Sequence, residues 1–524
     1  MAAAAHRSTG LLEHDEAISL LTAAGQVPRW QELQEAGSGM VWSASAAELQ
    51  ALLRPAAGTT TSDVLHSLLR YDQHPPLYFL VLRGLLYLDR GSPFWARLFG
   101  TAAVLMAAWA ANRWIWPHAA AGGRWLGLAW LAGAVVMVGA ATELRQYAVV
   151  LLGTTLSVAA WILWWEGNAP RYRVVLLLTL APVLLLWTHY AAVVWVAVGL
   201  AALPVGLGCT GWHRWRTPAT ALLMGSLFLS PLAMWRLQST AELADVGNLP
   251  LADYWREAVL PLARAMQEAW LPLPWRWQTE TLSLGVTAAL LLVWAAVAAG
   301  GMPTADRILL AAALIWGAVW LLLLCRGQVP MHAVKAKYLA PLLVVPLVLL
   351  VRAVSAERPR WVRRTAIAVL LASVAANAAA LRGVLGSRPE APLLAGLAGT
   401  RCLLTDSLSR GYVLPLVQKL SPDATVLVMP PGRAEDCWDE VWFRLPERGL
   451  TLVEVHRLPN APRTRDWAAV IQRLAFMYER QEQLWSGPRR TILTFSGRRP
   501  SSAADGVNGP ERPAARGEGE RPGA

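Results

Sequence analysis

Charged residues are scarce in this sequence. They make up 16% of its 524 residues, whereas an ordinary soluble domain carries about 25%. Hydrophobic residues reach 55%, the mean hydropathy is +0.37, and 28 residues are tryptophan. This composition excludes an ordinary soluble protein and predicts one that crosses a membrane many times.

Cysteine is also scarce, because the chain has only four. That number is too small for a disulfide framework. Cys209 and Cys325 lie beside or within apolar runs, where a buried thiol is the ordinary state. Only Cys402 and Cys437, both in the polar C-terminal part, could pair.

Two signals of other protein classes are absent. The first residues, "MAAAAHRSTGLLEHDEA", contain no apolar stretch long enough for a signal peptide. No internal repeat of solenoid period is found either. The first entry into the membrane is therefore expected later in the chain.

The net charge of +12 has an explanation within a membrane protein. Lysine and arginine accumulate in short cytoplasmic loops, and tryptophan suits both membrane interfaces. Basicity therefore gives no support to a nucleic-acid partner, and none is predicted.

Apolar runs of about the length needed to cross a hydrocarbon core of roughly 30 Å predict ten transmembrane helices. The apolar run from Val174 to Gly208 is too long for one span, so it is divided at "WTHY", where the polar His189 marks a turn; one long tilted helix is the alternative. The spans are expected near 94–116, 125–141, 143–164, 173–189, 190–210, 217–236, 281–300, 308–326, 338–352 and 363–385.

The charged loops predict an orientation. "EGNAPRYR", "WHRWR", "ADR" and "RAVSAERPRWVRR" all fall on one side of the alternation, which the positive-inside rule makes cytoplasmic. Everything before Pro93, the loop 237–280 and the region from about 390 are then extracytoplasmic.

The C-terminal region differs in pattern from the rest. Strand-like runs such as "ATVLVMP" and "LTLVEVHRL" alternate with a helical stretch around Trp467 to Leu484, which predicts a small α/β domain. We therefore expect an all-α polytopic membrane domain followed by this domain. The divisions are 1–92 (an extracytoplasmic loop with interfacial helices), 93–386 (transmembrane helices), 387–496 (α/β) and 497–524 (a disordered tail).

Near the N-terminus two adjacent carboxylates, Asp15 and Glu16, precede an apolar run in "HDEAISLL". Such a pair suits a general base or a divalent-metal site. The alternative is a structural role, because this sequence is also typical of the first turn of a helix.

A histidine and two prolines open the stretch "YDQHPPLYFLVLRGLLYLD", 71–89. Prolines favour the first turn of a helix. Because this stretch must remain outside for the later loops to alternate, we expect an interfacial helix here, with His74 just ahead of it.

Further polar residues lie at the predicted outer ends of spans, where charges are functional candidates. Arg97 lies about one turn into one span, and Glu143, Arg145 and Tyr147 start another. Membrane anchors or ion-pair partners are the alternative for flanking charges.

Two histidines and two lysines complete the set. His189 and His332 could be loop histidines with ordinary hydrogen bonds, and Lys335 and Lys337 could be snorkelling lysines. Together with Arg97 and Arg145, the lysines also form a possible anion site at the outer leaflet. A base on an outer loop and cations near the headgroup plane are what a transferase using a lipid-phosphate donor needs.

The order of these motifs resembles a known family. "HDEA", "HPPLYFLVLRGLLY", "ARLFGTAAV", "ELRQYAVVLLGTTLSVAAW", "THYAAVVWV" and "KYLAPLLVVP" follow one another as in bacterial GT-C glycosyltransferases of the family 39 type. These are relatives of protein O-mannosyltransferases and of the aminoarabinose transferase that modifies lipid A. The resemblance covers about 11–385, and the C-terminal region fits the soluble domain that many such enzymes carry.

The resemblance implies an inverting hexosyl- or pentosyltransferase in the bacterial inner membrane, with its active site and C-terminal domain outside the cytoplasm. It would take a sugar from a polyprenyl-phosphate donor to a lipid, glycan or protein acceptor. The catalytic acidic residue of the family maps onto Asp15, with Glu16 beside it. The donor phosphate and lipid would be contacted by His74, Arg97, Arg145, Tyr147, Lys337 and Tyr338, and the substrate cavity would include His189 and His332.

The resemblance also implies either no cofactor or a divalent metal at the acidic pair. Two departures stand out. Lys337 replaces an arginine that is usual in the family, which keeps the charge but loses the bidentate fork. The transmembrane helix that precedes the acidic pair in the family is missing here, and we expect that the true start lies further upstream.

Two other functions remain open. A transporter or flippase of a lipid-linked or anionic substrate would also use basic residues at a membrane cavity, although no repeated halves with broken helices are found. A ligase or polymerase of cell-surface polysaccharide would share the lipid-phosphate chemistry but release a diphosphate.

Overall fold

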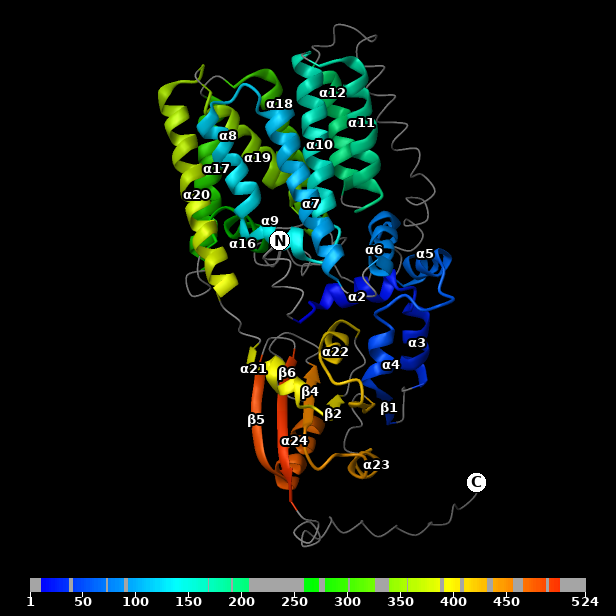
Figure 1. Ribbon diagram of the computed structural model, residues 1–524. Helices are drawn as coiled ribbons and strands as arrows, with labels where there is room; N and C mark the ends of the chain where they lie inside the picture. The colour runs from blue at the N-terminus through cyan, green and yellow to red at the C-terminus, as the bar shows by residue number, and fades with distance from the viewer. Residues whose placement is uncertain are drawn as a thin grey trace, which may run out of the picture. The chain divides into compact units, whose positions relative to one another are not determined.

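The structure, a computed structural model, forms two compact units (Figure 1). A helical unit comprises Met1–Trp30 and Ala51–Glu390, and a sheet unit comprises Gln31–Gln50 and Ala391–Ala524. The residues described are 11–36, 41–71, 74–88, 93–167, 169–189, 192–206, 259–272, 279–299, 302–325, 339–355, 357–386, 391–405, 410–430, 437–455, 465–486 and 490–499.

Within these ranges, five helices are long and apolar enough to cross a membrane, or six spans if one bent pair counts as a span. The five correspond to five of the ten predicted spans. They are α7 (Phe94–Ala110, continued by the π-turn η1, Ala111–Ile115), α10 (Tyr147–Glu166), α17 (Glu280–Ala299), α18 (Thr304–Cys325) and α20 (Arg360–Gly386).

The bent pair is α8 (Ala121–Gly133) with α9 (Val135–Thr142), which meet at 50°. Ala134 between them has extended backbone angles, φ −64° and ψ 133°. The backbone N–H of Val135 donates to Oδ1 of Asn377 on α20 at 2.9 Å. Since a broken helix exposes polar backbone groups that lipid cannot satisfy, this amide stabilises the break.

Three other predicted spans are short. The predictions at 173–189, 190–210 and 338–352 correspond to α11 (Arg171–Leu186), α12 (Ala192–Gly206) and α19 (Ala340–Ala353). With 16, 15 and 14 residues, they fall below the roughly 20 that a bilayer core requires. The prediction of ten spans is therefore not confirmed, and the one at 217–236 lies outside the described residues.

In the described part of the helical unit, four further helices lie where no span was predicted: α2 (His14–Ala23), α5 (Thr61–Arg70), α6 (Pro76–Leu88) and α16 (Leu260–Trp270). Helix α6 has 13 residues, too few to cross a bilayer. Its helical form agrees with the prediction for this stretch, and an interfacial position stays a prediction.

A charge network joins helix ends at the C-terminal end of α19. Arg352 donates to Glu166 on α10 at 2.6 Å and to Asp306 on α18 at 2.8 Å. Arg358 adds a second contact to Asp306 at 3.2 Å. Because these side chains are largely buried, each charge needs its partners, and the network fixes three helix ends together.

The sheet unit contains a six-stranded sheet in the order β1-β3-β2-β4-β6-β5. The central strands β3, β2 and β4 are parallel, and the outer pairings are antiparallel. Helices α3 (Val27–Ala36, in which the division between the units falls), α4 (Ala46–Ala51), α21 (Ala391–Ala398), α22 (Arg410–Val417), α23 (Trp438–Trp442) and α24 (Arg465–Met477) accompany the strands. The strands are β1 (Trp42–Ser45), β2 (Cys402–Thr405), β3 (Thr425–Val428), β4 (Leu450–Val455), β5 (Tyr478–Ser486) and β6 (Arg490–Arg498).

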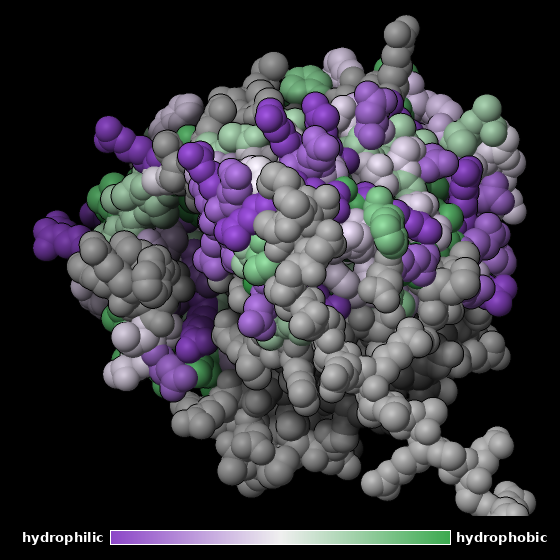
Figure 2. Space-filling view, turned by 90° about the horizontal axis from the view of Figure 1, so that it is seen from below, coloured by the Kyte–Doolittle hydropathy of each residue, from purple (hydrophilic) through white to green (hydrophobic). Residues whose placement is uncertain are grey.

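The sheet has an apolar core and a polar exterior. Leu404, Leu427 and Leu452 on the parallel strands pack with Trp467 of α24. On the face of the molecule shown in Figure 2, most coloured side chains are hydrophilic and hydrophobic ones are scattered between them. Such a face suits contact with water.

Three details differ from the predictions for this region. Strand β1 comes from the N-terminal segment and pairs with β3, with Trp42 opposite Val428. The helix expected around Trp467 to Leu484 ends at Met477, because the following residues pair with β6 as β5. Cys402 is a buried free thiol, so it forms no bridge.

Candidate functional site

Helix α2 carries the two adjacent carboxylates. Its N-cap is Glu13, whose backbone N–H donates to Oε2 of Glu16 at 2.8 Å, one half of a capping box. Acidic side chains in a first turn also favour the positive end of the helix dipole. The alternative, a structural role in the first turn of a helix, therefore holds for Glu16.

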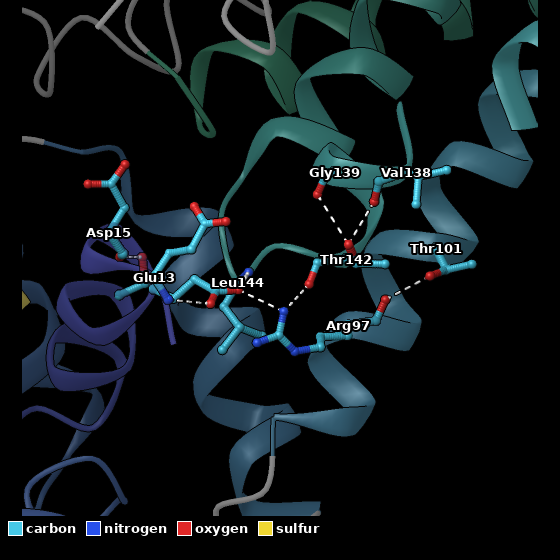
Figure 3. Close-up of polar contacts among 10 residues, drawn as sticks. Glu13, Asp15, Arg97, Thr101, Val138, Gly139, Thr142 and Leu144 are labelled. Atoms are coloured by element: carbon cyan, nitrogen blue, oxygen red, sulfur yellow. Dashed lines mark hydrogen bonds and ion pairs between the residues drawn. The ribbon is translucent and has the colours of Figure 1, made fainter. Parts of the chain in front are cut away.

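Glu16 is buried, with 1% of its side chain exposed. Its Oε1 accepts from Nη1 of Arg97 at 2.7 Å and from the backbone N–H of Leu144 at 3.0 Å. The same guanidinium donates to the carbonyl of Thr142 (Figure 3). One ion pair therefore joins α2, α7 and the connection between α9 and α10.

A close helix approach makes this geometry possible. A Cβ at Gly100 on α7 would clash with the carbonyl of Ala141 on α9. The glycine thereby lets α9 come near enough for Thr142 to reach Arg97 one turn earlier on α7. Any larger residue at this position would force the helices apart.

Asp15 lies in the same turn as Glu16 but in a different environment. Its side chain is half-buried, and in Figure 3 its carboxylate points away from Arg97. The backbone carbonyl of Asp15 accepts from the hydroxyl of Ser19 at 3.0 Å. Of the two carboxylates, Asp15 is the one outside the buried ion pair.

A second buried cation, Arg145, lies beside this pair. Its Nη1 donates to Oγ of Ser19 at 3.2 Å, and its Nη2 lies 3.3 Å from Nε2 of His74. The guanidinium is also 5.8 Å from the ring centre of Tyr147. Arg145 therefore connects α2 with the start of α6 and the start of α10.

His189 completes this group of rings. It follows α11, and the backbone N–H of Leu77 on α6 donates to the carbonyl of Trp187 at 3.1 Å, which brings the two segments together. The ring of His189 lies 6.3 Å from that of His74 and 6.5 Å from that of Tyr147.

Burial, together with the electrostatic effects of the neighbouring His74 and Arg145, lowers the pKa of His189 to about 3. A fully buried imidazole beside the guanidinium of Arg145 is therefore neutral at physiological pH. Neutral imidazole can both donate and accept one hydrogen bond.

Replacing His189 with glutamine is expected to flatten the pH dependence of stability. In the wild type, unfolding lets this side chain bind a proton at its ordinary pKa of 6.5, whereas the folded state resists protonation down to about 3. The contribution of neutral His189 to the free energy of unfolding is therefore fully present above its unfolded-state pKa. This contribution is lost as the pH falls from that value toward the folded-state pKa. Thermal unfolding in detergent at about pH 7 and about pH 4.5 measures how strongly the stability of each variant depends on pH.

The exposed His66 on α5 offers a matched control, because His66→Gln makes the same chemical change away from the cluster. Equal pH slopes for wild type and His189→Gln would contradict the assignment of a neutral, buried His189.

The cluster contains three residues that the sequence did not single out. Ser19 links Asp15 to Arg145. Tyr78 on α6 is buried, and burial raises the pKa of its phenol, which keeps it a proton donor. Gln146 is fully buried, and its side-chain amide has no hydrogen-bond partner within the described part of the chain. Gln146 could have been found from the sequence, because its polar side chain stands between Arg145 and Tyr147.

The structure thus gathers most of the residues named from the sequence. His332, Lys335, Lys337 and Tyr338 lie outside the described residues, so their roles stay predictions. Within the ranges that the structure describes, no three His, Cys, Asp or Glu side chains form a group that could hold a metal ion, and dependence on a divalent metal stays a prediction.

No protein-family model and no curated protein matches this chain. Among solved structures it is similar to ArnT from Cupriavidus metallidurans bound to undecaprenyl phosphate, with 14% identity and a TM-score of 0.40 over 84% of this chain and 89% of that chain. It is also similar to the same protein in the apo state, with 14% identity and a TM-score of 0.45 over 90% and 98%. At this identity these likenesses fix no residue role, which follows only from this chain's own side chains.

Proposed function

We propose that this protein is an integral membrane glycosyltransferase that moves a sugar from a polyprenyl-phosphate donor to an acceptor hydroxyl, with inversion. The observation that carries the proposal is the cluster itself. Two buried guanidinium groups, Arg97 and Arg145, and the carboxylates Asp15 and Glu16 gather from three distant parts of the chain. Charges buried beside apolar helices are costly and are functional candidates by default.

The two cations have different surroundings. Arg97 already faces the carboxylate of Glu16 at 2.7 Å, so its charge is balanced. Arg145 faces the hydroxyl of Ser19 and the imidazole of His74. A phosphate group that binds beside Arg145 and His74 would meet this buried guanidinium, and preorganised cations stabilise a leaving phosphate best where water is excluded.

The transfer step uses Asp15 as the base. The acceptor hydroxyl attacks the anomeric carbon of the donor, the bond from that carbon to the phosphate oxygen breaks, and polyprenyl phosphate leaves with the electron pair. The proton of the hydroxyl passes to the carboxylate of Asp15. Attack from the face opposite the phosphate inverts the anomeric centre.

Glu16 has a supporting role in this proposal. Both of its oxygens accept hydrogen bonds, from Arg97, Leu144 and Glu13, so it fixes the first turn of α2 and with it the backbone of Asp15. A base held on a rigid element is more effective than one on a loose loop. His189 and His332 would line the substrate cavity, and Tyr147, Lys337 and Tyr338 would contact the donor phosphate and lipid.

The proposal includes a place in the cell. The carboxylates, Arg145 and the sheet unit would lie on the extracytoplasmic face of the bacterial inner membrane, since the basic loops predict the opposite end as cytoplasmic. The acceptor would be a lipid, a glycan or a protein.

The experiment is a product assay with the purified protein. It is incubated in detergent with a panel of polyprenyl-phosphate sugars and candidate acceptors, and released lipid is identified by mass spectrometry. Release of polyprenyl monophosphate that requires both protein and acceptor supports the proposal. Release of polyprenyl diphosphate would instead show a ligase or polymerase, and movement of intact donor across proteoliposomes without release would show a flippase.

A further inference from the structure

An open groove of about 540 Å³ lies between α8 and α20, away from the charged cluster. Small side chains from both helices, Ala129, Gly133 and Ala378, form part of its lining. A Cβ added at Gly133 would meet no atom within 4 Å. The two helices therefore leave real space between them at this place.

The lining of the groove is largely apolar. Asn377 contributes to it, but the amide of Asn377 is already engaged with Val135, Ala269 and Ser373. The remaining apolar side chains, Val374, Leu381 and Leu385, come from α20. This part of the groove suits a hydrocarbon chain.

Helix α20 faces away from the protein interior. Only 17% of its apolar window is buried, the lowest share among the five candidate spans in the described residues. Leu371 and Val384 are each 51% exposed. Exposed apolar side chains on a span of this length contact lipid, so the groove opens toward the bilayer.

Arg382 gives the groove a charged end. It lines the groove, is exposed, and within the described part of the chain makes no hydrogen bond or ion pair. It lies three residues before Leu385, where the candidate span ends. A cation near the end of a span reaches headgroup depth, where lipid phosphates lie.

We propose that this groove binds one anionic phospholipid, with an acyl chain between α8 and α20 and the phosphate on Arg382. The apolar lining selects a hydrocarbon chain, and the unpaired guanidinium selects a negative headgroup. The inference goes beyond the proposed sugar transfer and does not depend on it, since the groove is built from other residues.

Photoaffinity labelling tests the site. The purified full-length protein is labelled with phosphatidylglycerol that carries a diazirine on one acyl chain, and the labelled peptides are mapped by mass spectrometry. Label is expected on α8 and α20. Arg382→Ala is expected to reduce it about fivefold, because a cation near anionic lipid contributes about that factor. Gly133→Leu fills the groove and is expected to reduce it about tenfold or more.

Matched controls make the result specific. Arg360→Ala removes an exposed arginine at the other end of α20, and Gly285→Leu fills equally open space on α17; both are expected to leave this label unchanged. Arg382 is exposed, so its variant should fold normally even if Gly133→Leu does not.

Three results would overturn the proposal. The label could be absent from α8 and α20, or its amount could be unchanged in both Arg382→Ala and Gly133→Leu. Zwitterionic phosphatidylcholine could label the groove as well as phosphatidylglycerol, which would remove the role of Arg382. Polyprenyl phosphate could displace the phospholipid at lower concentration, which would make the occupant a donor or product lipid instead.

Discussion

Asp15→Asn is expected to lower the release of polyprenyl phosphate by about 10²- to 10⁴-fold, the usual contribution of a positioned general base. Asparagine keeps the size of the side chain and its place in the first turn of α2, but cannot take the proton of the acceptor hydroxyl. Because Asp15 lies outside the buried pair of Glu16 and Arg97, the fold should remain intact. The loss should therefore appear in kcat, with thermal stability close to that of the wild type.

A matched control is available in the sheet unit. Asp423 is exposed, and Asp423→Asn makes the same chemical change far from the cluster in sequence. It is expected to keep full activity. Equal release by wild type and Asp15→Asn would remove Asp15 from catalysis, and then the base would have to be sought elsewhere.

The five long apolar helices could be predicted from apolar length. The stretches that became α7, α10, α17, α18 and α20 could be predicted because each carries about 20 apolar residues between polar ends. The length of an apolar run can be read from the sequence alone, because a bilayer core requires a similar apolar length of every helix that crosses it.

Breaks and pairings could not be predicted in this way. The bend at Ala134 depends on Asn377, more than two hundred residues later, which satisfies the freed N–H of Val135. The pairing of β1 with β3 joins Trp42 to Val428. Such contacts between distant segments leave no local pattern, so the sequence analysis missed both.

The candidate site likewise combines residues that could be predicted from the sequence with contacts that could not. Arg97 and Arg145 stood out because they interrupt apolar sequence near predicted span ends, and Glu16 stood out because it is adjacent to a second carboxylate, Asp15. Their partners did not: the carbonyl of Thr142 and the N–H of Leu144 are backbone groups, and any residue supplies those. The charged members of a cluster can therefore be proposed from the sequence, whereas the structure shows that Glu16 is the carboxylate that pairs with Arg97.

Arg97→Met is expected to destabilise the helical unit by about 3 to 5 kcal/mol, because it leaves the buried carboxylate of Glu16 without its counter-charge. Glu16→Gln should cost a comparable amount for the converse reason. The double variant removes both charges and should be more stable than the sum of the single losses predicts, a coupling that a double-mutant cycle measures by thermal or denaturant unfolding in detergent.

The exposed pair Arg264 and Glu280, 3.6 Å apart with 46% and 58% of the side chains exposed, provides the comparison. A solvated pair contributes about 0 to 1 kcal/mol, so Arg264→Met should change stability little. If Arg97→Met cost no more than Arg264→Met, or if the losses from Arg97→Met and Glu16→Gln simply added, the buried pair would not be what holds α2 to α7. In that case the first turn of α2 would depend on its capping box alone, and the placement of Asp15 would need another explanation.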